Sequence, residues 1–351
     1  MDLEVATREI QTEPRVSIIV PCRNEEDFID ASMTSILSQK EPSGGFEVVL
    51  VDGRSEDKTL RKARMIAAND ERLIVLDNPK KLVSTGMNIG IEHARGEIIL
   101  RMDAHCDYPN DYVRRLVDLL ETSGADNVGG VLVAIGKTGI QEAIGAAYRT
   151  PIGTGVALRA HPEDGRVCEV DAVWGGCWWR SRLYEIGLFD ETMVRNQDDE
   201  LCFRLRELGG KVLQSSSIRI SYHVRDSFRR LFGQYLQYGF WKVRLIHKHK
   251  KQSRPRHYIP ALFVIYLLAF SLGALFYPSL VWALATGVII YAASVVLFAS
   301  REAAISGWRL LPGIVIAMAA MHFGYGFGFI LGVANLMVGL PSKTSFQHLT
   351  R

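Results

Sequence analysis

Three long segments without charged side chains close the sequence, and they limit what the chain can fold into. Residues 259–276, 280–299 and 310–340 contain no Asp, Glu, Lys or Arg. A helix of roughly 20 apolar residues crosses the hydrocarbon core of a bilayer, and three such runs in succession are rare in soluble folds. We therefore expect a transmembrane region over 259–340 with about three helices, at 259–276, 280–299 and 310–336, followed by a tail at 341–351. A short polar loop with Arg301, Glu302 and Arg309 should precede the last helix, whose glycines suit close helix packing or a re-entrant segment.

Charge divides the remaining chain into two regions. Residues 1–226 hold 28 Lys and Arg against 37 Asp and Glu, whereas residues 227–258 hold nine Lys and Arg and no acid. An excess of Lys and Arg beside a membrane span stays on the cytoplasmic side. We therefore expect a multi-pass protein of the inner (plasma) membrane with its acidic body in the cytoplasm. The five scattered cysteines form no CxxC pair, which suits a reducing compartment.

The acidic body alternates between two kinds of hydrophobic pattern. Short apolar runs predict strands at 16–20, 46–51, 73–76, 97–102 and 128–133, and helical spacing predicts helices at 27–37, 59–68, 84–94 and 112–120. Alternating strands and helices predict an α/β domain with a mostly parallel sheet, which we place at 1–225.

Polar side chains follow three of these strands, where an α/β sheet binds its ligands. A single acid after a strand is often only a turn former or helix cap. Three clusters in one half-domain favour a shared site, and the absence of GxGxxG and GxxxxGK[ST] disfavours a dinucleotide or P-loop fold. The clusters are Arg23, Asn24 and Glu25 after the first strand, Asp52, Ser55 and Asp57 after the second, and Asp103 and His105 after the fourth.

Five segments resemble the inverting, nucleotide-sugar-dependent glycosyltransferases of family 2, which have the Rossmann-like GT-A fold. They are VSIIVPCRNEE (16–26), VDGRSEDKT (51–59), MNIGIEHARGEIILRMDAH (87–105), WGGCWWRSRLYEIGLFDE (174–191) and NQDDELCFRLRELG (196–209). The resemblance covers roughly residues 14–245. Within the family the chain looks most like the bacterial exopolysaccharide enzymes of the succinoglycan type.

The resemblance implies a donor site and a divalent cation, Mn²⁺ or Mg²⁺. Asp103 and His105 would ligate the cation, in a DAH sequence where the family commonly has DxD. A neutral imidazole in place of a carboxylate tilts the preference towards Mn²⁺. His105 as a packed strand-end residue is the alternative, with Asp107 as a substitute ligand. The implied donor-binding residues are Pro21, Arg23, Asn24, Glu25, Asp52, Ser55, Asp57, Lys81, Asn88, Asp103 and Ala104.

The acidic run Asp198-Asp199-Glu200 aligns with the family's catalytic acids. Inverting transfer needs a general base for the acceptor hydroxyl. The alignment puts Asp198 on that base, with Asp199 as the second candidate and Glu200 as an acceptor-binding or loop-orienting residue. The alternative is an acid cluster that interacts with a helix dipole.

Residues 226–258 are expected to form a basic, amphipathic helix at the membrane interface, because Phe228, Leu231, Phe232 and Tyr235 share one helical face. Lys242 or Arg244 would meet a lipid phosphate, with a plain basic anchor as the alternative. Phe240 replaces the Arg of the family's QxxRW motif, which argues against a processive synthase. The expected acceptor-binding residues are Trp174, Gly175, Gly176, Gln237 and Trp241.

Together these features predict a metal-dependent hexosyltransferase of exopolysaccharide or related glycan synthesis. It would move one hexose, glucose first among the candidates, from a UDP-linked donor to a saccharide on a polyprenyl diphosphate. The partners are the nucleotide sugar, the lipid-linked acceptor and membrane lipids, with no nucleic acid; a homo-oligomer stays open. The alternatives are a polyprenyl-phosphate sugar synthase and a non-catalytic membrane scaffold with a degenerate transferase fold.

Overall fold

The body of the molecule is one nine-stranded sheet, in a computed structural model that describes residues 13–154 and 165–339. The strand order is β3-β2-β1-β4-β8-β6-β9-β5, with β7 paired to β9. The strands are β1 Val16–Cys22, β2 Phe46–Asp52, β3 Leu73–Asp77, β4 Ile98–Arg101, β5 Cys106–Asp107, β6 Asn127–Ile135, β7 Val167–Glu169, β8 Cys177–Trp179 and β9 Val212–His223.

The first four strands of the sheet order are parallel, which confirms the predicted α/β fold class. Their register places Cys22 opposite Asp52 and Asp52 opposite Asp77, so the loops after β1, β2 and β3 leave the sheet at one edge. β8 lies antiparallel to both β4 and β6, and β6 is parallel to β9. The sheet is therefore mixed where it meets the second half of the chain.

Helices cover both faces of the sheet because alternate strand side chains point to opposite sides. Ile18 and Val20 of β1 pack with one set of helices, and Ile19 packs with the other. The first set is α1 Ile29–Leu37, α2 Thr59–Ala67 and α4 Tyr112–Ser123. The second is α3 Val83–His93, α7 Arg180–Glu185 and α8 Gln197–Glu207.

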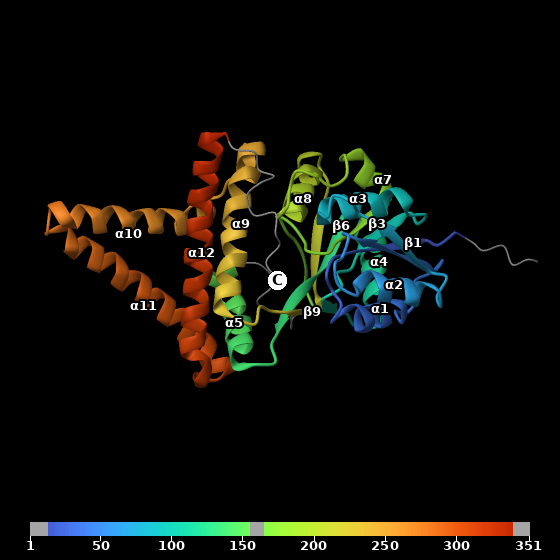
Figure 1. Ribbon diagram of the computed structural model, residues 1–351, viewed down its shortest axis with the longest axis horizontal. Helices are drawn as coiled ribbons and strands as arrows, with labels where there is room; N and C mark the ends of the chain where they lie inside the picture. Colours follow the sequence, from blue (N-terminus) through green and yellow to red (C-terminus); the bar gives the residue numbers. More distant parts are fainter. Residues whose placement is uncertain (1–12, 155–164, 340–351) are drawn as a thin grey trace, which may run out of the picture.

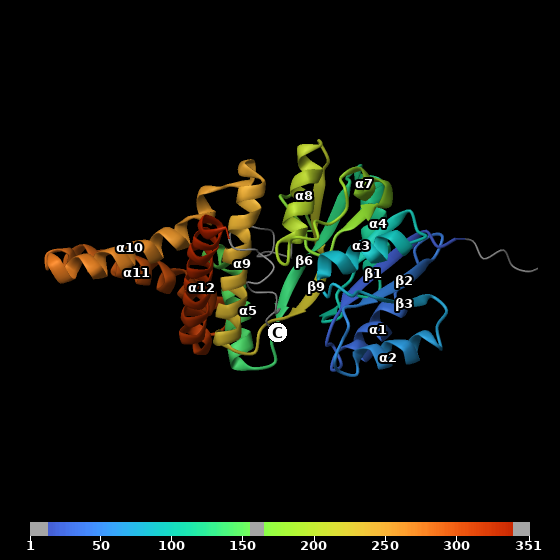
Figure 2. The ribbon, with the colours of Figure 1, turned by 45° about the horizontal axis from the view of Figure 1, so that its top comes forward.

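A separate group of helices lies beyond the β6–β9 end of the sheet. In Figures 1 and 2, α5, α9 and α12 stand side by side, and the α10–α11 pair projects away from the domain. The helices are α5 Gly139–Arg149, α6 Pro151–Thr154, α9 Phe228–Lys248, α10 Ile259–Phe276, α11 Leu280–Ser306 and α12 Leu311–Val338. Short 3-10 turns lie at Lys250–Gln252, Pro255–His257 and Trp308–Leu310.

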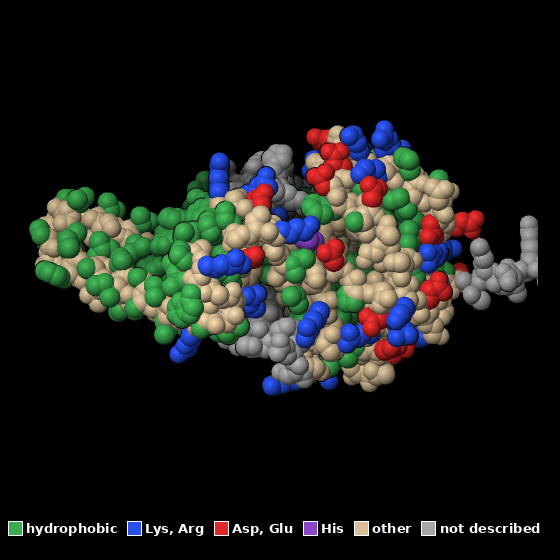
Figure 3. All heavy atoms as spheres, turned by 90° about the horizontal axis from the view of Figure 1, so that it is seen from below, with side chains coloured by type: hydrophobic (Ala, Val, Ile, Leu, Met, Phe, Trp, Pro, Cys, Tyr) green, Lys and Arg blue, Asp and Glu red, His purple; other side chains and the backbone are tan. Residues whose placement is uncertain are grey.

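Three helices in the described residues are long and apolar enough to cross a membrane: α10, α11 and the segment Trp308–Val338, which contains α12. They differ in exposure, because the most apolar windows of α10 and α11 are 11% and 6% buried, whereas that of α12 is 44% buried. Figure 3 shows apolar side chains over the projecting end and charged side chains over the opposite end. The expected tail at 341–351 lies outside the described residues.

The polar loop expected around Arg301 and Glu302 is wrong, because α11 continues through both residues to Ser306. The Nε of Arg149 on α5 donates to the carboxylate of Glu302 at 2.8 Å. This ion pair supplies the partner that a carboxylate needs beside an apolar span, so the helix need not end before the charge.

The face of α9 predicted to lie on the bilayer is instead covered by protein. Leu231 is buried, and Phe228 and Tyr235 pack into a cluster formed with α5, α11 and α12. α5 belongs to the sequence of the α/β domain yet packs among the helices after residue 226. The predicted domain boundary at residue 225 therefore does not separate two packing units, because α5 belongs to the helices that follow it.

Candidate active site

A buried arginine joins the two carboxylates that sequence reasoning placed at the reaction centre. Asp103 follows β4, and Asp198 lies in the first turn of α8. Arg101, at the end of β4 and 4% exposed, donates from Nε and Nη2 to Asp103 at 2.8 and 3.0 Å. Its Nη1 donates to both oxygens of Asp198 at 2.9 and 3.0 Å. One guanidinium thus fixes two residues that are far apart in the chain.

Backbone contacts fix the end of β4. The Asp103 N–H donates to the hydroxyl of Tyr108 at 2.7 Å, and the Arg101 N–H donates to the carbonyl of Gly176 at 3.1 Å. Gly175 has a left-handed φ of +57°, and a Cβ on Gly176 would overlap the side-chain oxygen of Asn127. Gly175 therefore permits the turn beside Arg101, and Gly176 permits the close approach to Asn127.

Burial shifts the pKa values of two groups at this centre. Burial raises the pKa of Asp198 to about 6, against the opposing effect of Arg101 and with help from the charges of Asp103 and Asp199. Burial also lowers the pKa of His105 to about 4, against the opposing effect of Asp103. At neutral pH Asp198 is therefore an ionised carboxylate and His105 a neutral imidazole.

The loops after β1 and β2 are tied together by backbone-to-side-chain hydrogen bonds. The Asn24 N–H donates to Ser55 Oγ at 2.9 Å, and the Glu56 N–H donates back to Asn24 Oδ1 at 2.9 Å. Asp57 accepts from the Glu26 N–H at 3.1 Å. Ser55 Oγ in turn donates to Asp52 at 2.6 Å. These loops form a rigid rim at the carboxyl edge of the sheet.

One large cavity, of about 2090 Å³, opens beside this rim. Ten predicted site residues line it: Pro21, Arg23, Asn24, Glu25, Lys81, Asp103, His105, Trp174, Asp198 and Asp199. The other predicted residues are not among those that line the cavity: Asp52, Ser55, Asp57, Asn88, Ala104, Gly175, Gly176, Glu200, Gln237 and Trp241. The second group includes residues that hold the first in place, as the Asp52–Ser55–Asn24 contacts show.

The three acids of the 198–200 run have different surroundings. Asp199 lines the cavity but pairs with Lys242 of α9 at 3.0 Å. Glu200 is fully buried and binds Arg204, Lys248 and His249, so it joins α8 to α9 away from the cavity. Asp198 pairs with Arg101, the same guanidinium that holds Asp103.

The expected acceptor residues divide in the same way. Trp174 lines the cavity, with the Arg101 guanidinium 5.9 Å from its ring centre. Gln237 is buried and accepts from Arg195 Nε at 3.2 Å, and Trp241 is 1% exposed and packs with Met193 and Val194. Trp241 therefore has a packing role, and Gln237 positions Arg195.

The loop after α7 is held by the predicted donor residue Asn88. Its Nδ2 donates to the Phe189 carbonyl at 2.9 Å, and its Oδ1 accepts from the Phe189 N–H at 2.9 Å. Asn88 therefore fixes the segment that leads towards Asp198.

Comparison with known proteins identifies the family. The model described as Glycosyl transferase family 2 matches residues 17–159. Succinoglycan biosynthesis protein ExoA of Rhizobium meliloti is 30% identical over 246 residues, which are 69% of this chain and 73% of the relative. The chain belongs to glycosyl transferase family 2.

Other relatives of this family 2 glycosyltransferase differ in their substrates. A dolichyl N-acetyl-α-D-glucosaminyl phosphate 3-β-D-2,3-diacetamido-2,3-dideoxy-β-D-glucuronosyltransferase of Methanococcus voltae is 26% identical over 66% of this chain and 74% of its own length. The mannosyltransferase PcManGT of Pyrobaculum calidifontis, solved with GDP-Man and Mn²⁺, has a TM-score of 0.57 at 18% identity and covers 93% of this chain and 88% of its own. S. aureus TarS 1-349 has a TM-score of 0.52 at 16% identity, over 93% and 92%. The two structures share the fold.

The described residues offer two ligands for a divalent cation in the cavity, Asp103 and His105. Within residues 13–154 and 165–339, no three His, Cys, Asp or Glu side chains converge to hold a metal ion. Asp103 and His105 both face the cavity, and the neutral imidazole of His105 has a lone pair to offer. The donor set among the described residues is thus one carboxylate and one imidazole, so a bound cation would take its remaining oxygen ligands from elsewhere.

Sequence reasoning missed several cavity-lining residues of the glycosyltransferase, namely Arg101, Arg195, Tyr222, Arg225 and Tyr238. Arg101 left a signal, since a charged residue inside the apolar run 98–102 needs a buried partner. The others come from loops and helices with no ligand-binding pattern of their own. Lys242 and Arg244, expected at a lipid phosphate, are engaged elsewhere: Lys242 pairs with Asp199, and Arg244 donates to Asn335.

Proposed function

We propose that this family 2 enzyme transfers a single hexose, glucose in the first instance, from a UDP-linked nucleotide sugar to a lipid-linked saccharide, with inversion at the anomeric carbon. The observation that supports it best is the Asp103–Arg101–Asp198 ion triad beside a cavity that begins at the donor rim and continues to the membrane helices. The product would belong to exopolysaccharide or related glycan synthesis, as the ExoA relative suggests.

Asp198 is the general base in this proposal. The acceptor hydroxyl attacks the anomeric carbon, its proton passes to Asp198, and the bond from that carbon to the diphosphate oxygen breaks. The raised pKa of Asp198, about 6, suits this role, because the carboxylate is ionised at neutral pH yet basic enough to accept a proton. Arg101 orients the carboxylate and prevents it from rotating away.

Asp103 and His105 would hold Mn²⁺ or Mg²⁺ together with the donor diphosphate. When bound, such a cation neutralises charge that develops on the leaving diphosphate. To take part, Asp103 must share its oxygens between Arg101 and the cation. The four lone-pair positions of a carboxylate allow this.

The donor rim supports a uridine nucleotide. Asp52 is buried between Val51 and Gly53, which both line the cavity. Its oxygens accept from the N–H and the hydroxyl of Ser55 and retain further lone pairs. A uracil imino N–H is a donor that such a carboxylate accepts.

The membrane position follows from the basic residues before α10. Arg254 and Arg256 lie in the segment that leads into α10, and an excess of such residues marks the cytoplasmic side. In this proposal the catalytic domain is cytoplasmic, and the acceptor lies in the inner leaflet of the plasma membrane.

A donor panel tests the function. The detergent-purified chain is incubated with nucleotide sugars, Mn²⁺ and membrane lipid extract, and the lipid products are analysed. We expect a UDP-hexose to give a glycosidic product, and Asp198→Asn to lower transfer by roughly 10²- to 10⁴-fold. Asp199→Asn is the matched control and should retain most activity. Equal turnover by wild type and Asp198→Asn would overturn the base assignment.

A second candidate, polyprenyl-phosphate sugar synthesis, is favoured by two cavity arginines, Arg195 and Arg225, that meet no carboxylate in the described part of the chain. There the nucleophile is a phosphate oxygen, which needs no deprotonation. The product separates the two functions, because a sugar phosphodiester is labile to mild acid whereas a glycosidic bond to a saccharide is more resistant.

A further inference from the structure

The cavity does not end at the catalytic carboxylates. Beyond Asp198 it continues past α9 and is lined by side chains of the three apolar helices. These include Phe263 and Tyr266 of α10, Ile290 and Tyr291 of α11, and Met321 and Tyr325 of α12. A molecule with a polar head and an apolar tail therefore finds both environments in one continuous space.

Two arginines line this cavity without a carboxylate partner in residues 13–154 and 165–339. Arg195 precedes α8, donates to the neutral Gln237 and lies with its guanidinium 5.8 Å from the Tyr238 ring centre. Arg225 follows β9 and makes no hydrogen bond or ion pair in the described part of the chain; its Nε is buried. By contrast, Asp103 and Asp198 neutralise Arg101, and Asp199 neutralises Lys242. Among the residues that the structure describes, no carboxylate pairs with these two arginines, so the described lining of this part of the cavity carries positive charge available to an anion.

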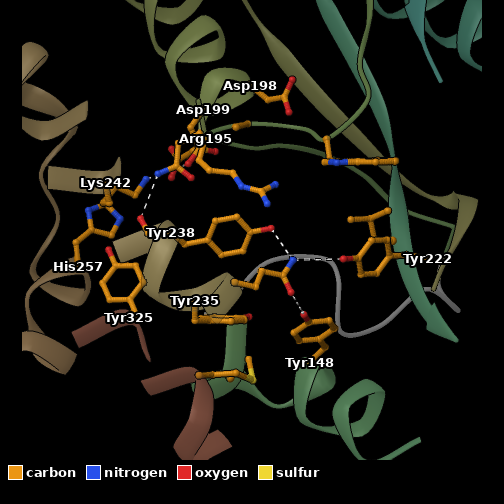
Figure 4. A pocket seen from close by; sticks show the side chains of 18 of the residues that line it. Tyr148, Arg195, Asp198, Asp199, Tyr222, Tyr235, Tyr238, Lys242, His257 and Tyr325 are labelled. Carbon is orange, nitrogen blue, oxygen red and sulfur yellow. Dashed lines mark hydrogen bonds and ion pairs between the residues drawn. The ribbon is translucent and has the colours of Figure 1, made fainter. Parts of the chain in front are cut away.

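Two tyrosine hydroxyl groups that line the same cavity accept hydrogen bonds from one glutamine, which leaves their own protons free to be donated. Buried Gln234 donates from Nε2 to the hydroxyl oxygens of Tyr222 at 3.3 Å and Tyr238 at 3.0 Å, and its Oε1 accepts from Tyr148 (Figure 4). Because each of these two oxygens already accepts a hydrogen bond, its own proton is available to a further acceptor. In Figure 4 the Arg195 side chain extends towards the space between Tyr238 and Tyr222. Two guanidinium groups and two hydroxyl protons thus make a surface of donors.

We infer that Arg195, Arg225, Tyr222 and Tyr238 bind a phosphate group of the lipid-linked acceptor, with the lipid chain running between α10, α11 and α12. The inference rests on the proposed function for its choice of acceptor. Guanidinium groups pair with phosphate oxygens through charge-assisted, often bidentate hydrogen bonds. The position between Asp198 and the membrane helices matches a molecule whose phosphate joins a sugar to a lipid.

Direct binding tests this site without any transfer reaction. The full chain in detergent is titrated with farnesyl diphosphate, and with farnesol as the phosphate-free control. We expect Arg225→Ala and Arg195→Ala each to weaken farnesyl diphosphate binding roughly ten- to a hundredfold, the worth of a charged hydrogen bond, and to leave farnesol binding unchanged. Arg225→Ala removes no hydrogen bond or ion pair in the described structure, so this variant should fold. Arg229→Ala, four residues away and exposed, is the matched control.

A parallel titration with UDP separates the two sources of phosphate. If UDP binding weakens as much as farnesyl diphosphate binding, the arginines serve the donor diphosphate and the acceptor assignment is overturned. Unchanged farnesyl diphosphate binding in both arginine variants would also overturn it. If no nucleotide sugar gives a product while these binding differences hold, the proposed function fails and the anion site stands.

A second, independent observation concerns the helix α12. Three glycines of α12, spaced four residues apart, lie against backbone carbonyls of α9 with the same spacing. The pairs are Gly324 with Phe232, Gly328 with Leu236 and Gly332 with Phe240, so the two helices run parallel. A Cβ at Gly328 would overlap the Leu236 carbonyl oxygen. At the far end Arg244 of α9 donates to Asn335 of α12. The two helices therefore lie together over most of their length.

α9 is in turn fixed to the catalytic domain, through Lys242 to Asp199 and Lys248 to Asp190 and Glu200. If α12 crossed the bilayer, α9 and these ion pairs would be carried into hydrocarbon, where charges are costly. The geometry points to α12 lying along the membrane surface, so that the chain crosses only as the α10–α11 hairpin. In Figure 1 that hairpin projects at a steep angle to α9 and α12.

Cysteine labelling with a membrane-impermeant maleimide distinguishes two crossings from three. The positions are Met65→Cys on α2, Ser279→Cys between α10 and α11, and a cysteine added after Arg351; the unmodified chain reports background. With two crossings, the added C-terminal cysteine reacts from the same side as Met65→Cys, and Ser279→Cys reacts from the other. Reaction of the C-terminal cysteine from the side of Ser279→Cys, or of Ser279→Cys from the side of Met65→Cys, would overturn the proposal.

Discussion

The two ends of the cavity are built in opposite ways. The donor end is made by loops that follow β1, β2 and β4, all within residues 16–105, and the loops after β1 and β2 are joined by hydrogen bonds. The acceptor end takes its lining from α5, β9, α9 and the three apolar helices, spread over residues 148–325. The donor end is therefore a local structure, and the acceptor end exists only when the whole chain is assembled. Variants in one end should affect one substrate, and variants at their junction should affect both.

The largest loss of activity is expected at the junction of the two ends, which is the Asp103–Arg101–Asp198 ion triad. Arg101→Met leaves Asp103 and Asp198 buried without their shared cation, which typically costs about 3–5 kcal/mol of stability, and frees the base from its orientation. We expect transfer to fall by about 10³-fold, measured with saturating donor and acceptor. Arg54→Met, which removes an exposed pair with Asp77, should change little. Near-normal turnover by Arg101→Met would mean that the two ends are not coupled here.

The second-largest effect is expected from a substitution at the contact between α9 and α12, which supports the acceptor end. Gly328→Ala forces α12 away from α9, and overpacking of this kind costs about 1–3 kcal/mol. We expect a lower thermal unfolding temperature in detergent and a higher acceptor KM, with the donor KM unchanged. Gly139→Ala, where nothing lies within 4 Å, is the control. An equal rise in donor KM would contradict the separation of the two ends.

The dependence of the transfer rate on pH should reflect the ionisation of one group, Asp198. Because burial raises the pKa of Asp198 to about 6, its carboxylate is protonated below that pH and cannot accept a proton. The rate should rise tenfold per pH unit up to about pH 6 and then level off. His105, with its pKa near 4, stays neutral over that range. A kcat profile without this limb in wild type would exclude Asp198 as the base.

The smallest effect should come from the donor rim. Ser55→Ala removes the acceptor of the Asn24 N–H and one contact to Asp52, each worth about 1 kcal/mol. We expect the donor KM to rise about three- to tenfold and the acceptor KM to stay constant. Ser43→Ala, in an exposed turn, is the matched variant. A change in acceptor KM alone would reverse the proposed division.

The sequence predicts the donor half of the fold well because its signals are local. Apolar periodicity located β1 to β4 within a few residues, and the acids after each strand pointed to the correct edge of the sheet. The sequence did not predict that β8 lies antiparallel between β4 and β6. A strand of three residues is too short to show a hydrophobic pattern, and it forms because β4 and β6 pair with it. The sequence also contained no sign of the role of Arg195 and Arg225, which depends on their meeting no carboxylate among the described residues. That is a property of the assembled packing, not of their flanking residues.

The position of α5 has a consequence for how the protein is made. Arg149 of α5 binds Glu302, a residue 153 positions later. At a synthesis rate of about 5–20 residues per second, α5 leaves the ribosome roughly 8 to 30 seconds before its partner. During that interval the face of α5 that packs against α11 and α12 in the finished protein is without these two helices.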